Sequence, residues 1–109
     1  MREHMGRRGR AEKREIGKRE RADGLAIAAV EFLAGEPARI ARFLDMTGIT
    51  IESIRTAAGE PRFLAGVLDY VTNDEPLLLA FSRQAGVDPN EIVAARDILM
   101  DDSRERDTP

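Results

Sequence analysis

One stretch of the sequence constrains the fold more than any other, because it contains a complete helix, a stop signal and the capped start of a second helix. It spans residues 75–96. Its first helix is apolar almost all round, with Leu77, Leu79 and Phe81 among its side chains. A helix that is apolar on every side is normally buried. The sequence therefore predicts a central, buried helix up to residue 85, in which truncation of Leu79 or Phe81 to alanine unfolds the domain or nearly so.

The corner after this helix carries the usual signals for one helix ending and another beginning. Gly86 ends the first helix, and Asp88 suits the N-cap of the second. Pro89 suits the first helical position, and Val87 and Ile92 are spaced as a hydrophobic staple across the cap. The stretch thus predicts a helix-turn-helix corner.

A weaker copy of this corner lies upstream. Gly48 and Ile54 precede Gly86 and Ile92 by the same 38 residues, and Thr50 stands where the second corner has its N-cap. A period near 40 residues is typical of helical repeats. Two interpretations stay open: two tandem three-helix units, or chance similarity between short amphipathic helices.

The spacing of apolar residues and of helix-breaking residues predicts about six short helices. Their expected ranges are residues 22–34, 37–47, 51–58, 61–72, 75–85 and 89–101. In the third, Ile51 and Ile54 are expected on the inner side. No alternating run is long enough for a sheet, and the connections are a few residues long. The sequence therefore predicts an all-α fold, a compact bundle with helix-turn-helix-like corners.

Charge divides the chain unequally. Residues 1–21 carry nine lysine or arginine residues against four glutamates, a net charge of +5, which leaves −8 for residues 22–109. The first part has too few apolar side chains to bury itself in a core. We therefore expect residues 1–21 to be a basic, disordered N-terminal arm, residues 22–101 a helical domain, and residues 102–109 a charged C-terminal tail.

The basic arm supplies the candidate binding residues. A basic arm on an acidic body can contact phosphate backbones without recognising base sequence, and the alternative is a solvated leader. The candidate nucleic-acid contacts are Arg7, Arg8, Arg10, Lys13, Arg14, Lys18, Arg19 and Arg21. The corners themselves suit DNA recognition poorly, because the helices that would enter the groove carry about as many acidic as basic side chains.

The groups that catalysis requires are nearly absent. His4 is the only histidine and lies in the arm, there is no cysteine, and no lysine follows Lys18. Ser53 and Ser82 have no activating base in their sequence context, and Ser82 suits close helix packing. The acidic residues near the C-terminus fit a solvated tail better than a cation site. We therefore expect no enzyme activity, no cofactor and no metal site.

The remaining expectations concern location and partners. No apolar run approaches the roughly 20 residues of a membrane-spanning helix, no signal peptide follows the basic start, and the absence of cysteine fits a reducing compartment. A cytoplasmic protein with no membrane association is expected. The leading hypothesis is a protein-interaction or regulatory module with an unidentified protein partner. The alternative is a nucleic-acid-associated protein that uses the arm, and the sequence leaves homo-oligomerisation open.

Four ordered segments carry a resemblance to a known family. They are residues 32–35, 42–49, 63–71 and 79–89. Together they resemble the alphaproteobacterial domain-of-unknown-function family 3572 over about residues 25–100. The resemblance implies no activity and no site residues, and the basic arm lies outside it.

Overall fold

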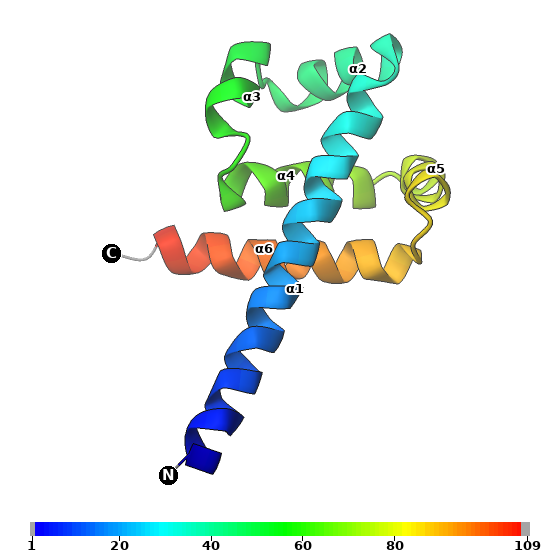
Figure 1. The fold of residues 1–109 in the computed structure, drawn as a ribbon. Helices are drawn as coiled ribbons and strands as arrows, with labels where there is room; N and C mark the ends of the chain where they lie inside the picture. The colour runs from blue at the N-terminus through cyan, green and yellow to red at the C-terminus, as the bar shows by residue number, and fades with distance from the viewer. Residues whose placement is uncertain (1, 108–109) are drawn as a thin grey trace.

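In the computed structural model, the chain forms six helices, and no strand occurs in residues 2–107 (Figure 1). The structure describes the backbone of residues 2–107 and the side chains of residues 16–104. The helices are α1 (Arg2–Ala34), α2 (Pro37–Thr47), α3 (Ile51–Ala57), α4 (Pro61–Thr72), α5 (Glu75–Ala85) and α6 (Pro89–Asp107). The predicted all-α fold is confirmed.

The centre of the fold is α4, in which six of twelve residues are buried. The helix α6 runs antiparallel beside it, and α1 crosses both (Figure 1). Phe63, Val67 and Val71 of α4 recur at helical spacing, and Leu64 and Leu68 widen the stripe by one residue. A stripe of this width lets α4 pack against α1 and α6 at the same time.

Small side chains bring α1 close to this pair of helices. Ala22, Ala26 and Ala29 are each at most 1% exposed, and Leu33 continues the same stripe for one more turn. On α6, Ile92, Ala95 and Leu99 face the core at a spacing of three and four residues. The core therefore lies between α1 on one side and the α4–α6 pair on the other.

The predicted central position of α5 is wrong. This helix lies at one end of α4 and α6 (Figure 1), and of its eleven residues, all described, only Phe81 and Ser82 are buried. Leu79 is 39% exposed, and Leu77 and Leu78 are half-buried. One ring is enough to attach the helix, because Phe81 packs on Phe32 of α1 with ring centroids 5.3 Å apart. This short helix is therefore only partly covered, although it has apolar residues on every side.

Both corners have the predicted capping geometry. Gly48 and Gly86 have φ values of 74° and 71°, in the left-handed region that favours glycine. The side chains of Thr50 and Asp88 accept hydrogen bonds of 3.1 and 2.8 Å from backbone N–H groups in the first turn of α3 and α6. The predicted stop and start signals are confirmed at both places.

The helices that follow the two corners pack differently. The helix α6 lies along α1 and α4, whereas none of the seven residues of α3, all of them described, is buried. Ile51, predicted on the inner side of α3, is 59% exposed, so that prediction is wrong. A helix of seven residues is about 10 Å long, too short to reach past its own corner. The capping signals repeat along the chain, and the packing around them does not.

Two helices are longer than predicted. The backbone of α1 is helical from Arg2, not from about residue 22, and α6 continues to Asp107, not to about residue 101. Lysine, arginine and glutamate dominate the extension of α1, and arginine and glutamate make up half of the extension of α6. These residues are good helix formers, and no proline interrupts either extension. The division into arm, domain and tail stays a prediction. Within the part that the structure describes, no helix is both long and apolar enough to cross a membrane.

Candidate functional site

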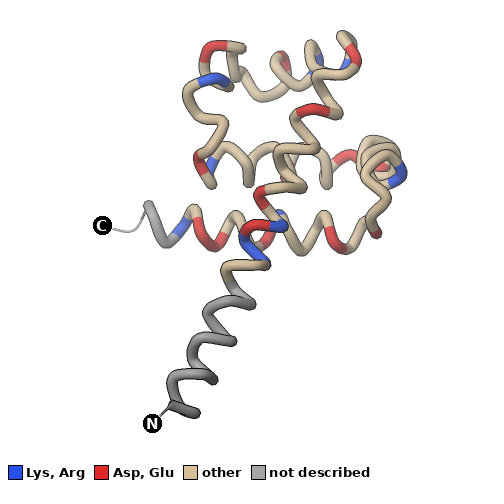
Figure 2. The backbone as a smooth tube through the Cα atoms, in the orientation of Figure 1, with Lys and Arg blue, Asp and Glu red and all other residues tan. Residues whose placement is uncertain are grey.

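The sequence-predicted basic residues fall into two groups. Five have side chains outside the described residues, as does His4: Arg7, Arg8, Arg10, Lys13 and Arg14. The other three, Lys18, Arg19 and Arg21, are exposed on α1 close to its crossing with α6 (Figure 2). Among the described side chains, the structure therefore places these three basic residues against the folded body.

These three residues lie beside an acidic helix. Lys18 and Arg21 border a groove of about 290 Å³ between α1 and α6 whose apolar lining includes Leu25 and Ile98. A guanidinium nitrogen of Arg19 lies 3.6 Å from a carboxylate oxygen of Asp102. Because the Arg19 side chain is about half exposed, such a pair contributes at most about 1 kcal/mol to stability. The groove has a basic border, but its polar groups do not converge on one point.

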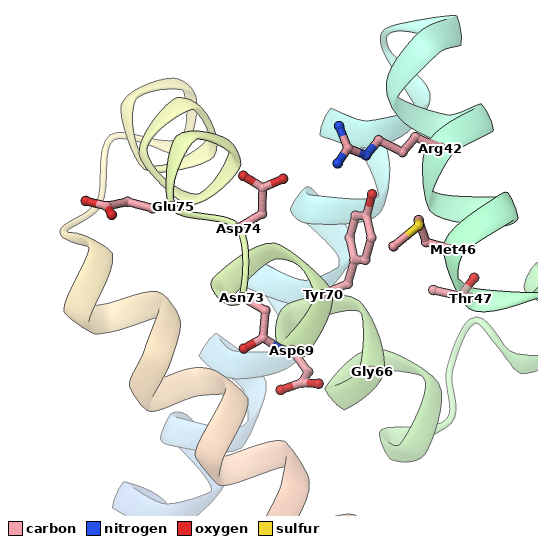
Figure 3. A pocket seen from close by; sticks show the side chains of 9 residues that line it. All are labelled: Arg42, Met46, Thr47, Gly66, Asp69, Tyr70, Asn73, Asp74 and Glu75. Atoms are coloured by element: carbon pink, nitrogen blue, oxygen red, sulfur yellow. The ribbon is translucent and has the colours of Figure 1, made fainter.

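A larger cleft, of about 560 Å³, lies between α2, α4 and the start of α5 (Figure 3). Arg42 and Thr47 of α2 form one wall, and Asp69 with residues 73–75 forms the other wall. Gly66 and Tyr70 of α4 form the floor together with the side chain of Met46. We call it the α2–α4 cleft. Beside it, the ring of Phe43 on α2 packs edge-on against Tyr70 of α4, with ring centroids 5.0 Å apart.

The floor of the cleft is apolar and open. The ring of Tyr70 is half-buried, and Met46 beside it is 68% exposed (Figure 3). Gly66 leaves the surface of α4 bare, since a Cβ atom built there would meet no atom within 4 Å. A methionine side chain is flexible and polarisable, which suits it to surfaces that adapt to a partner. The floor therefore presents uncovered apolar surface.

Polar groups surround this floor. On the α2 wall, the guanidinium of Arg42 lies on the same side as the Tyr70 hydroxyl (Figure 3). On the other wall, Asp74 caps α5 by accepting a 3.2 Å hydrogen bond from the Leu77 N–H. Among the described residues, neither Arg42 nor Glu75 has an ion-pair partner. The cleft therefore offers charged groups whose interactions within the chain are incomplete.

The cleft carries more negative than positive charge. Its carboxylates are Asp69, Asp74 and Glu75, and Arg42 is its one cation. Asp69 is partly compensated by Arg96 at 4.0 Å, although that guanidinium pairs more closely with another carboxylate on α6. The surplus of carboxylate is largest along the wall formed by the end of α4 and the start of α5.

The α2–α4 cleft combines polar side chains with an apolar floor. Its residues provide hydrogen-bond donors and acceptors around an apolar floor, and none is a histidine, a lysine or a cysteine. Among the side chains of residues 16–104, no group of three or more histidine, cysteine, aspartate or glutamate residues is arranged to hold a metal ion. An apolar floor with a few convergent polar groups is the usual form of a binding site.

A family model described as "Protein of unknown function (DUF3572)" matches residues 19–102. The chain belongs to this family. The DUF3572 match contains the whole α2–α4 cleft together with Arg19 and Arg21, whereas Lys18 and the preceding basic residues lie outside it. No curated protein and no solved structure matches the chain.

Sequence reasoning missed the cleft of this DUF3572 chain. The cleft is formed by residues of three helices, and each helix was predicted from its own spacing alone. One signal was available. Gly66 lies in the middle of a strongly apolar helix and shares a helical face with Tyr70 and Asn73 at spacings of four and seven residues. A glycine in a helix interior weakens the helix and usually has a packing or functional reason.

Proposed function

We propose that this DUF3572 protein is a non-catalytic interaction module that binds a cationic segment of a partner protein in the α2–α4 cleft. The observation that carries the proposal is an open apolar floor bordered by charged side chains whose ion pairing within the chain is incomplete. Two features identify the class of partner, namely the sign of the charge and the shape of the cleft.

The surplus of carboxylate favours a cationic partner. Lysine or arginine side chains of the partner pair with Asp74, which borders the cleft, and with Glu75, whose side chain points outward at the start of α5 (Figure 3). One large apolar side chain of the partner then covers Met46 and Tyr70. Complementary charge of this kind raises association rates and selects against acidic partners.

The open shape favours a protein segment over a small molecule. A small-molecule site usually encloses most of its ligand, whereas this cleft is bounded by α2 on one side and by the short turn of residues 73–75 on the other (Figure 3). A peptide satisfies both requirements, because its backbone extends beyond the cleft while single side chains enter it.

The test uses Gly66→Leu to fill the cleft without disturbing the core. Gly66 is exposed, and a Cβ atom at this position meets nothing within 4 Å. The matched control is Gly24→Leu, at another exposed glycine in a helix, where a Cβ atom also meets nothing within 4 Å. Both variants should keep the far-UV circular dichroism spectrum of the wild type.

Binding is then measured by fluorescence anisotropy with labelled cationic helical peptides that carry one isoleucine, and with the same peptides after lysine is exchanged for glutamate. We expect the cationic peptides to bind, the acidic ones not to bind, Gly66→Leu to weaken binding about tenfold or more, and Gly24→Leu to leave it unchanged. Equal binding by the two leucine variants would overturn the proposal, as would binding of neither peptide set.

A second candidate function is association with nucleic acid through the basic N-terminal arm. The observation in its favour is that Lys18 and Arg21 are exposed on α1, next to the other predicted phosphate contacts in the sequence. The full-length protein should then bind oligonucleotides with an affinity that falls steeply as salt rises, and a chain without residues 1–21 should not bind. Equal and negligible binding by both at low salt would exclude this function.

A further inference from the structure

We infer that the cationic segment that fills the α2–α4 cleft is the basic N-terminal part of α1 from a second copy of this chain. The inference rests on the proposed function of the cleft and names its partner. Two copies exchange these segments, so that each cleft receives the α1 helix of the other copy.

The first argument is that this segment has the chemistry which the cleft requires. Residues 13–19 carry four lysine or arginine residues and one glutamate around a single large apolar side chain, Ile16. Ile16 is 55% exposed on a helix, with no place in its own core. It provides the one large apolar group needed to cover Met46 and Tyr70, and the surrounding cations match Asp74 and Glu75.

The second argument is that the segment cannot fill the cleft of its own chain. The helix α1 is continuous from Arg2 to Ala34, and α2 follows its C-terminal end. Ile16 therefore lies about 27 Å along the helix axis from Ala34, and the N-terminal end of α1 extends away from α2 (Figure 1). An intramolecular contact would require α1 to break where Ala22 and Ala26 are buried. A second copy meets no such obstacle.

The third argument is closure. When each copy gives its helix to the other, both contacts form in one two-fold complex, and no cleft or basic segment is left to recruit a third chain. The unequal charge of the chain favours this exchange, because the net charge of +5 on residues 1–21 attracts the acidic remainder of another copy. Contacts between opposite charges weaken with salt, so the dimer should dissociate as ionic strength rises.

Sedimentation equilibrium of the full-length protein provides the first test. We expect a salt-sensitive dimer, and we expect Ile16→Asp to raise the dissociation constant about tenfold or more. Ile27→Asp is the matched control, because Ile27 is the other exposed isoleucine of α1, at 48%. A monomeric wild type at low salt would overturn the inference, and so would equal effects of the two aspartate variants.

A mixed sample locates the interface. The chain has no cysteine, so Glu20→Cys takes a single nitroxide label one turn away from Ile16 without replacing it. This copy is mixed with one carrying ¹³C-methyl methionine. We expect the Met46 methyl signal to broaden, the Met100 signal to broaden less, and both to recover when the methionine-labelled copy carries Gly66→Leu. A dimer in which Met46 is unaffected, or in which Gly66→Leu changes nothing, would contradict the inference.

A free peptide of residues 10–21 separates the two proposals. If the peptide binds the cleft of the wild type and not that of Gly66→Leu, while the intact chain stays monomeric, the cleft takes cationic segments and the second copy is not its partner. If neither this peptide nor the other cationic peptides bind, both proposals are wrong. If the arm binds oligonucleotides and Met46 does not respond to a second copy, the arm serves nucleic acid.

Discussion

Truncation of Phe81 tests the position that the structure gives to α5. Phe81 is 1% exposed, and its ring packs on Phe32 with centroids 5.3 Å apart. Loss of a buried phenylalanine side chain costs about 3–5 kcal/mol, in a domain whose total stability is on the order of 5–15 kcal/mol. Leu79, two residues away on the same helix, is 39% exposed. Because much of its side chain is already in water, Leu79→Ala should cost only about 1 kcal/mol.

The assay is urea unfolding followed by far-UV circular dichroism, with both variants measured beside the wild type. We expect Phe81→Ala to be largely unfolded without urea or to unfold at a much lower urea concentration. We expect Leu79→Ala to shift the midpoint slightly with the same slope, since the surface exposed on unfolding hardly changes. Equal losses for the two variants would refute the reasoning, because α5 would then be buried on both sides.

Three further changes have definite expected outcomes. Asp88→Ala removes the N-cap of α6 and should lower the free energy of unfolding by about 1 kcal/mol in thermal melts; no loss would mean that the cap hydrogen bond is unimportant. Gly66→Ala should raise it by about 0.5–1 kcal/mol, because glycine weakens a helix interior and the added methyl meets nothing; a loss would show hidden crowding. Deletion of residues 1–15 should leave the melting temperature nearly unchanged, whereas deletion of residues 1–21 should lower it, since α1 would then begin at the buried Ala22 and its first turn would fray. Equal effects of the two deletions would contradict this.

The corners were predictable from the sequence because their signals are local. A glycine in the left-handed conformation followed by an N-cap residue fixes the chain direction within a few residues, and Gly48 and Gly86 both have this geometry. One element of the second corner was not predicted. The Ser82 hydroxyl donates a hydrogen bond to the Val87 carbonyl across the turn, where the sequence suggested only a small residue for close packing. Its partner lies five residues away, and no helical spacing indicates such a bond.

The position of α5 was not predictable from its own composition. Apolar residues on all sides show that a helix prefers cover, but the cover depends on which other helices reach it. Here α1, α4 and α6 close the core among themselves, and α5 adds one ring to it. The alanines that let α1 approach α4 and α6 are only weakly hydrophobic, so the sequence marks them only weakly as core residues. In the structure, Ala26 and Ala29 are 0% exposed.

The candidate site was harder to predict than the fold for a related reason. The basic residues were identified by charge alone, and charge needs no structure. The α2–α4 cleft brings together residues 42–47 and 66–75 from three helices, and neither segment contains a motif. What unites them is the crossing of α2 over α4 at Phe43 and Tyr70, which is a result of tertiary packing.

The cleft is also the place where the chain departs most from the requirements of stability. Gly66 interrupts the most buried helix, although a larger residue there would meet no obstacle. Met46 exposes 68% of its surface, and Tyr70 is the one aromatic residue that is not buried. Several local rules fail together on this one face, although obeying them would cost the fold nothing, and this is an argument for the binding role that we propose for the cleft.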